Sequence, residues 1–180
     1  MNNRRAFIVG IKSKKLQSKE KSFLRKYKPW GVILFTRNIK DIKQTIRLTT
    51  SIRKIFNDNR YPILIDQEGG RVNRLKNIIS FDNLTSEFFG NKFIKNYREF
   101  NFFYKLFIDK TSYLLRLLGI NINTVPVLDL KIKGANKVIG DRSFSRNPKI
   151  VSKIGDYCIK YFKENRIGTV IKHIPGHGLA

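Results

Sequence analysis

The chain has 180 residues, enough for one hydrophobic core, so we expect a single domain over residues 1–180. Hydrophobic residues make up 41% and aromatic residues 12% of the chain, which excludes an intrinsically disordered protein. The formal net charge of +24 predicts non-specific binding to polyanions, although the basic residues are scattered and form no recognised nucleic-acid-binding module.

The cysteine content and the apolar runs indicate the cellular compartment of the protein. Cys158 is the only cysteine, which excludes an internal disulfide and suits a reducing cytoplasm. Its apolar helical neighbours favour a buried thiol over a catalytic one. The opening run 6–11 is too short for a signal peptide. Because Arg116 interrupts the best candidate for a membrane span, 113–122, we expect a cytoplasmic protein with no membrane partner.

The first part of the chain predicts a strand, a helix and a second strand. Residues 6–11 are strand-like, and Ser18 is a candidate N-cap for a short helix with apolar residues on one side. Pro29 breaks that helix. A buried strand follows at 31–35 and ends in the polar residues 36–38.

The next unit repeats the order of strand, polar tip and helix. Asp41, with Gln44 three residues later, is a capping-box-like start for a helix. The apolar positions of this helix follow the helical period at Ile42, Ile46, Thr49, Ile52 and Phe56. A third strand at 62–65 leads into the polar segment 66–74.

Two further units are predicted in the second half. Residues 78–93 are irregular, and we interpret them as a loop with short helical pieces. A long amphipathic helix covers 97–118 with Gly119 as its stop. Residues 121–129 are strand-like, with Pro126 implying an interruption or bulge inside the run.

The last unit begins with a loop at 131–138 and a compact polar motif at 139–144. Asn147 and Pro148 are a good N-cap and first position for a helix that reaches about residue 165. The apolar run from Gly168 starts a final strand, 168–173.

Buried strands that alternate with amphipathic helices predict an α/β fold with a parallel sheet of about five strands. A (βα)8 barrel needs eight strands and typically about 250 residues, so the pattern alone favours a small open sheet. In either architecture, ligands bind at the carboxyl edge of the strands. Polar residues gather just after the predicted strands, at Asn38, Asp66, Glu68, Asp129, Asp141, Arg142, Lys172 and His173.

Asp66 and Glu68 are the acidic pair that could suggest glycosidase chemistry. Such chemistry uses two carboxyl groups about 5–10 Å apart on opposite sides of the scissile bond. Residues two apart on one extended segment would point the same way and would not straddle a sugar. We therefore expect Asp66 to accept hydrogen bonds from sugar hydroxyls, or to form an ion pair with Arg71 or Arg74.

His173 and His177 have the four-residue spacing of a zinc-binding helix. Pro175 and Gly176 between them exclude that helix, so we expect no metal site. Neither a Walker A motif nor a dinucleotide-binding Gly-x-Gly-x-x-Gly motif is present.

Four separated motifs stand in order along the chain: IDQEGGRVNR at 65–74, GININTVPVLD at 119–129, IGDRSF at 139–144 and KHIPGHG at 172–178. Together they resemble the family 3 glycoside hydrolases. The resemblance is to the bacterial cytoplasmic β-N-acetylhexosaminidases of peptidoglycan recycling, and it extends to the opening segments 7–11 and 28–38.

The resemblance implies that residues 1–180 are the N-terminal portion of one (βα)8 barrel domain, with about its first five strands. It implies a retaining hydrolase that removes N-acetylglucosamine from muropeptides and needs no cofactor. The family's sugar-binding residues correspond, position by position, to Asp66, Arg74, Arg142, Lys172 and His173.

The family's catalytic groups do not correspond to residues of this chain. The acid/base histidine and the nucleophilic aspartate are expected beyond Ala180. The resemblance therefore predicts a truncated enzyme that is inactive alone. The alternatives are a non-catalytic remnant, a half-barrel that a second polypeptide completes, and a basic protein that binds nucleic acid.

Overall fold

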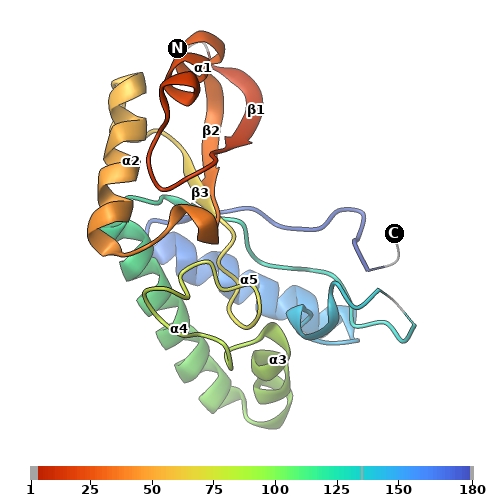
Figure 1. The fold of residues 1–180 in the computed structure, drawn as a ribbon. Helices are drawn as coiled ribbons and strands as arrows, with labels where there is room; N and C mark the ends of the chain where they lie inside the picture. Colours follow the sequence, from red (N-terminus) through yellow and green to blue (C-terminus); the bar gives the residue numbers. More distant parts are fainter. Residues whose placement is uncertain (1–3, 135, 179–180) are drawn as a thin grey trace.

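The computed structural model describes residues 4–134 and 136–178 and contains one parallel sheet (Figure 1). Its five strands follow one another in the sheet in chain order. The strands are β1 (Arg5–Gly10), β2 (Pro29–Leu34), β3 (Ile63–Ile65), β4 (Ile122–Asn123) and β5 (Gly168–Thr169). The predicted α/β class with about five strands is confirmed. Parallel strands that add in one direction form the winding of a (βα) barrel.

In the described ranges, five α-helices and two short 3-10 helices connect the strands. The helices α4 and α5 pack against each other, and α1 and α2 contact each other, with α1 at the end of the molecule that holds β1 and β2 (Figure 1). Their bounds are α1 (Ser18–Tyr27), η1 (Thr36–Asn38), α2 (Ile42–Phe56), α3 (Ser86–Lys95), α4 (Tyr97–Leu117), η2 (Gly140–Arg142) and α5 (Pro148–Glu164). Within the described ranges, no helix has the length and apolar character to cross a membrane.

The helix caps agree with the sequence at two positions and differ at one. Asp41 accepts the backbone N–H of Gln44 at 2.7 Å, as predicted for the start of α2. Asn147 caps α5 with Pro148 as the first residue, also as predicted. Ser18, the predicted cap of α1, is instead its first helical residue. Gln17 takes the cap position because its backbone N–H donates to the Glu20 carboxylate at 2.8 Å.

The segment 78–93 is more regular than its sequence predicts. Helix α3 begins at Ser86 and continues for ten residues to Lys95, and the hydroxyl of Thr85 accepts the Phe88 N–H at 3.0 Å as its cap. Gly90, a poor helix former, obscures the helical pattern. A Cβ at Gly90 would lie 1.7 Å from the carbonyl oxygen of Phe144, so glycine is required for the close approach of this loop.

The last two strands are shorter than predicted. Runs expected at 121–129 and 168–173 form regular pairing only over β4 and β5. Pro126 lacks a backbone N–H and interrupts the ladder, as its position predicts. Pairing resumes beyond it: Leu128 N–H donates to the Lys172 carbonyl at 2.6 Å, and Lys172 N–H donates to the Pro126 carbonyl at 3.1 Å. The two segments run side by side past the sheet (Figure 1).

An aromatic core fills the space between α3, α4 and α5. The ring centroids of Phe89 and Tyr104 are 4.8 Å apart, and those of Phe100 and Tyr104 are 5.1 Å apart. Cys158 is buried in this core as predicted, and burial raises the pKa of its thiol to about 12. Gly119 ends the α4 region with a φ of +73°, which explains its role as a stop.

Candidate functional site

Asp66 lies directly after β3, at the carboxyl edge of the sheet. Its Oδ2 accepts from Arg74 Nη2 at 3.1 Å, and its Oδ1 accepts from the Thr124 hydroxyl at 2.8 Å and contacts Lys172 Nζ. Burial alone would raise the pKa of this carboxyl, but the charge and hydrogen bond of Lys172, with the other donors, lower it. Asp66 is therefore ionised at neutral pH, and its side chain is 19% exposed.

Glu68 lies two residues further on and is held from two directions. Arg142, at the end of η2, donates to both carboxylate oxygens at 2.8 Å, and the hydrogen bond to Glu68 raises the pKa of the guanidinium. Lys172 Nζ is 2.6 Å from Glu68 Oε1. The Glu68 side chain is only 3% exposed, so it supports the two cations and is not itself open to a ligand.

The loop that carries these acids is shaped by two glycines and one buried amide. Gly69 has a φ of +93°, and a Cβ there would lie 2.3 Å from the Leu84 carbonyl oxygen. The side chain of Asn123, at the end of β4, accepts the Gln67 N–H and donates to the Gln67 carbonyl, each at 2.9 Å. This exchange fixes the backbone between Asp66 and Glu68.

A third acid, Asp129, holds the segment that follows β5. Its Oδ2 lies 2.6 Å from Nδ1 of His173 and accepts the His173 backbone N–H at 3.2 Å. Its Oδ1 accepts the His177 backbone N–H at 2.6 Å. Burial would raise the pKa of Asp129, but the hydrogen bonds from these two histidines outweigh it and lower the pKa.

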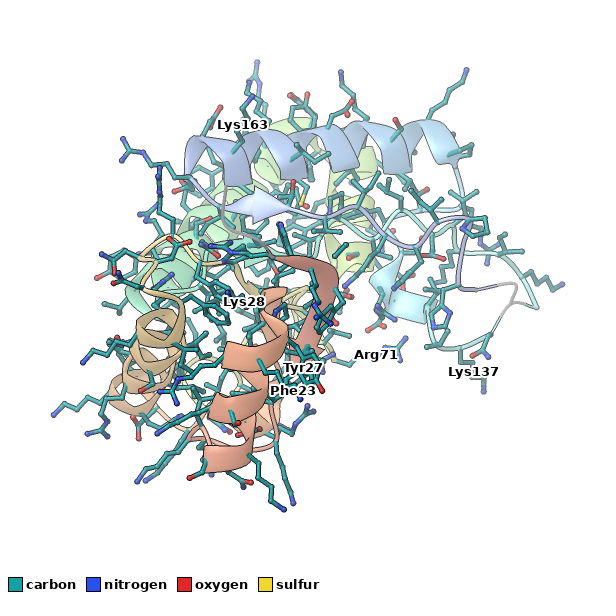
Figure 2. The ribbon with its side chains drawn as sticks, turned by 90° about the horizontal axis from the view of Figure 1, so that it is seen from above. Phe23, Tyr27, Lys28, Arg71, Lys137 and Lys163 are labelled. Atoms are coloured by element: carbon teal, nitrogen blue, oxygen red, sulfur yellow. The ribbon has the colours of Figure 1, made fainter. Side chains whose placement is uncertain are left out.

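The predicted site residues come together at one edge of the sheet. Arg74, Asp66 and Lys172 are joined in a chain of ion pairs that continues through Glu68 to Arg142. His173 follows Lys172 and is attached through Asp129. Of the two arginines predicted as ion-pair partners of Asp66, Arg74 is confirmed and Arg71 is wrong. Arg71 instead pairs with Asp141 at 2.8 Å and donates to the carbonyl of Lys137 (Figure 2).

Sequence reasoning did not assign site roles to Glu68, Asp129 and Thr124. The available signal was the scarcity of acids, 13 in 180 residues, together with the position of Glu68 and Asp129 just after predicted strands. The contacts of Thr124 depend on the break in β4 and could not be read from the pattern. Among the described residues, no group of three or more His, Cys, Asp or Glu could hold a metal ion.

A hollow of about 460 Å³ opens beside His173 and Asp129. Its other walls are mainly apolar and include Leu128, Leu130 and Pro175. A volume of this size accommodates a small ligand. The hollow thus presents the His173 imidazole beside apolar side chains, whereas the ion pairs around Asp66 lie outside its lining. Imidazole, carboxylate and cationic groups together supply donors and acceptors for a polar neutral molecule with several hydroxyl groups.

Residues 6–180 match the family described as "Glycosyl hydrolase family 3 N terminal domain". A β-hexosaminidase of Hydrogenovibrio crunogenus is 35% identical over 174 residues, covering 95% of this chain and 47% of that protein. β-Hexosaminidase A of Pseudoalteromonas piscicida is 35% identical over 161 residues, covering 86% of this chain and 26% of that protein. The chain thus spans about half of the first relative and less of the second.

Solved structures with a similar fold come from related enzymes. NagZ from Neisseria gonorrhoeae, in complex with N-trifluoroacetyl-D-glucosamine, superposes with a TM-score of 0.84 at 30% identity, covering 97% of this chain and 52% of that one. A glycoside hydrolase family 3 β-N-acetylglucosaminidase from a Paenibacillus species superposes with a TM-score of 0.80 at 28% identity, covering 96% of this chain and 32% of that one. The fold of the described residues is therefore that of a partial (βα) barrel.

Proposed function

The chain belongs to glycosyl hydrolase family 3, and we propose that residues 1–180 form the sugar-binding part of a β-N-acetylhexosaminidase. The substrate is a glycoside with N-acetylglucosamine at its non-reducing end. One observation carries this proposal: Asp66 is held ionised between Arg74 and Lys172 at the carboxyl edge of the sheet, partly open to solvent. The names of the related β-hexosaminidases and of the N-trifluoroacetyl-D-glucosamine complex support it.

The charges of the site suit a neutral sugar. Asp66 Oδ2 carries one of the described contacts and keeps lone pairs for ligand hydroxyls. Lys172, Arg74 and Arg142 each pair with Asp66 or Glu68, so every cation of the network already has a carboxylate partner. A hydroxyl-rich ligand can exchange hydrogen bonds with both signs of charge, whereas an anionic ligand would have to compete with Asp66 and Glu68 for the same cations.

The two carboxylates of the network do not break the glycosidic bond in this proposal. Asp66 and Glu68 both contact Nζ of Lys172, and the Glu68 side chain is only 3% exposed, so the two carboxylates do not face each other across an open space for a sugar. A retaining glycosidase requires a nucleophile and an acid/base on either side of the scissile bond. We place both groups outside residues 1–180, on further strands that complete the barrel.

The two edge strands of the sheet, β1 and β5, are consistent with a barrel that further strands complete. Among the described strands, β1 pairs with β2 and β5 pairs with β4, so each leaves one edge for a further strand. Those strands belong either to a longer chain or to a second polypeptide. In the biological setting that the resemblance implies, the completed enzyme acts in the cytoplasm on muropeptides during peptidoglycan recycling.

Hydrolysis of an aryl β-N-acetylglucosaminide by the 180-residue chain, beside an Asp66→Ala control, tests this assignment of roles. We expect no turnover from either protein, and turnover only when the rest of the barrel is supplied. Turnover by the chain that disappears in the Asp66→Ala variant would contradict the assignment, because the catalytic groups would then lie within residues 1–180.

A second candidate function rests on the net charge of +24. Such a charge attracts nucleic acids and other polyanions without any sequence-specific site. This binding would use the exposed lysines and arginines, and it is separable from sugar binding because the cations of the site are already paired with carboxylates.

A further inference from the structure

We propose that Asp129 is a positioning residue that fixes the ring tautomer of His173 and the course of residues 173–177. In this arrangement the His173 ring carries its proton on Nδ1 and offers Nε2 as a neutral hydrogen-bond acceptor. The role of that acceptor, to receive a sugar hydroxyl, rests on the proposed function. The tautomer and the loop geometry do not.

Three donors converge on the two oxygens of Asp129. The His173 ring and the His173 backbone N–H meet Oδ2 at 2.6 and 3.2 Å, and the His177 backbone N–H meets Oδ1 at 2.6 Å. The Asp129 side chain is 3% exposed, so these groups replace water as its partners. One carboxylate thus holds both ends of a loop that contains Pro175 and Gly176.

The tautomer follows from what a carboxylate can do. An ionised carboxylate only accepts hydrogen bonds, and the hydrogen bonds of His173 and His177 keep Asp129 ionised despite its burial. The ring nitrogen that faces Asp129 must therefore carry a proton. In the neutral imidazole this leaves the other nitrogen, Nε2, without one, and the side chain of His173 is 28% exposed and accessible to a ligand.

The backbone of Asp129 is itself held in place. The Asp129 carbonyl accepts the hydroxyl of the buried residue Ser143 at 2.6 Å, and the preceding residue, Leu128, donates to the Lys172 carbonyl at 2.6 Å. Asp129 therefore connects the segment after β4, the turn after η2 and the segment after β5. A group on such a support can hold a ring in one orientation.

The nitrogen chemical shifts of the histidine rings test this inference directly. The chain has only two histidines, and a His177→Gln variant assigns their signals. In a ¹⁵N-labelled sample at about pH 8, where an imidazole is neutral, we expect the protonated-nitrogen shift at Nδ1 of His173 and the unprotonated shift at Nε2. An Nε2-protonated ring in the unmodified protein would overturn the proposal without reference to any variant.

The variant Asp129→Asn removes one acceptor position, so one of the three donors must face an NH₂ group. We expect the His173 ring to shift toward the Nε2-protonated form, or exchange of the His177 amide hydrogen to accelerate by about tenfold or more. Asp141→Asn, in an ion pair with Arg71, is the matched control and should change neither signal. An unchanged tautomer together with unchanged amide exchange in Asp129→Asn would refute the positioning role.

Addition of N-acetylglucosamine to the same sample separates this inference from the proposed function. A sugar that binds should move the Nε2 signal of His173 and leave Nδ1 protonated. If the sugar moves no signal but the ring is Nδ1-protonated, the proposed function fails and the positioning role stands.

Discussion

Glu68 and Arg142 form a two-pronged ion pair, with Nε and Nη2 of the arginine each 2.8 Å from a different carboxylate oxygen. The pair joins the loop after β3 to η2, and both side chains are largely buried. Lys172 Nζ contacts the same carboxylate at 2.6 Å. Glu68 thus connects three segments of the site, although it is closed to the ligand.

The variant Glu68→Gln should lose stability as well as site geometry. The amide lacks the charge that balances Arg142 and Lys172, and removal of one partner from a buried ion pair typically costs about 3–5 kcal/mol. We expect a lower urea midpoint with an unchanged m-value. The matched control is Glu99→Gln, at the surface pair with Lys92, which should leave the midpoint close to that of the parent. Equal midpoints for the two variants would contradict this account.

Gly90 and Gly155 should respond differently to the same substitution. A Cβ at Gly90 would lie 1.7 Å from the backbone carbonyl oxygen of Phe144, and that backbone cannot move without displacing the turn beside Arg142. We therefore expect Gly90→Ala to destabilise the protein by about 1–3 kcal/mol. A Cβ at Gly155 meets a flexible methyl group of Leu128 at 2.9 Å. The gain in helix propensity, about 1 kcal/mol, offsets that contact. Thermal unfolding of both variants measures the contrast, and a greater loss for Gly155→Ala would contradict it.

The two aspartates of the site, Asp66 and Asp129, should make the stability of the protein sensitive to acid. The pKa values of Asp66 and Asp129 are lowered below their ordinary value of 3.8 by folding. A lowered pKa contributes stability that is present above the unfolded value and lost as pH falls through the folded value. We therefore expect the unfolding free energy to fall as the pH drops below about 4, the range of an unperturbed aspartate.

The variant Asp66→Asn tests this pH dependence. It should be less stable than the parent at neutral pH and should lose less additional stability on acidification. Asp141→Asn, at an exposed ion pair, should follow the parent curve. If Asp66→Asn and the parent lose stability in parallel as the pH falls, Asp66 does not contribute in this way.

The net charge should produce polyanion binding that is independent of the site. We expect retention on immobilised DNA at low salt, with an affinity that falls steeply as salt rises. The Asp66→Ala variant should retain this binding, and N-acetylglucosamine should not displace the DNA. Displacement of the DNA by the sugar would instead place both ligands at the same surface.

The sequence predicted the order of the elements because strands and helices leave local signals. The runs at 31–35 and 62–65 are continuously apolar, and Asp41 and Asn147 have the side chains of N-caps. The sequence does not predict α3 as a regular helix, because Gly90 disfavours a helix locally. Glycine is needed there for a close contact with the backbone of Phe144, which is remote in sequence. The sequence predicts β4 and β5 as longer than they are, because an apolar run does not show where the neighbouring strand stops pairing with it.

The sequence predicted that the site residues lie close together, but it did not predict which of them contact each other. Motif positions identified Asp66, Arg142 and Lys172, and their position after strands indicated a common edge. Nothing in the local sequence indicates that Glu68 receives two cations or that Asp129 receives three donors. Those pairings depend on loop paths fixed by contacts between distant segments, and residue spacing carries no information about them.

Calorimetric titration of the 180-residue chain with N-acetylglucosamine tests the central claim most directly, because it requires sugar binding without turnover. We predict saturable binding by the chain, a loss of at least about tenfold in affinity, or 1.4 kcal/mol, in Asp66→Ala, and unchanged affinity in Asp141→Asn. Absence of binding by the folded parent chain, or equal affinity in the parent and Asp66→Ala, would contradict the claim that this edge of the sheet is a sugar-binding site.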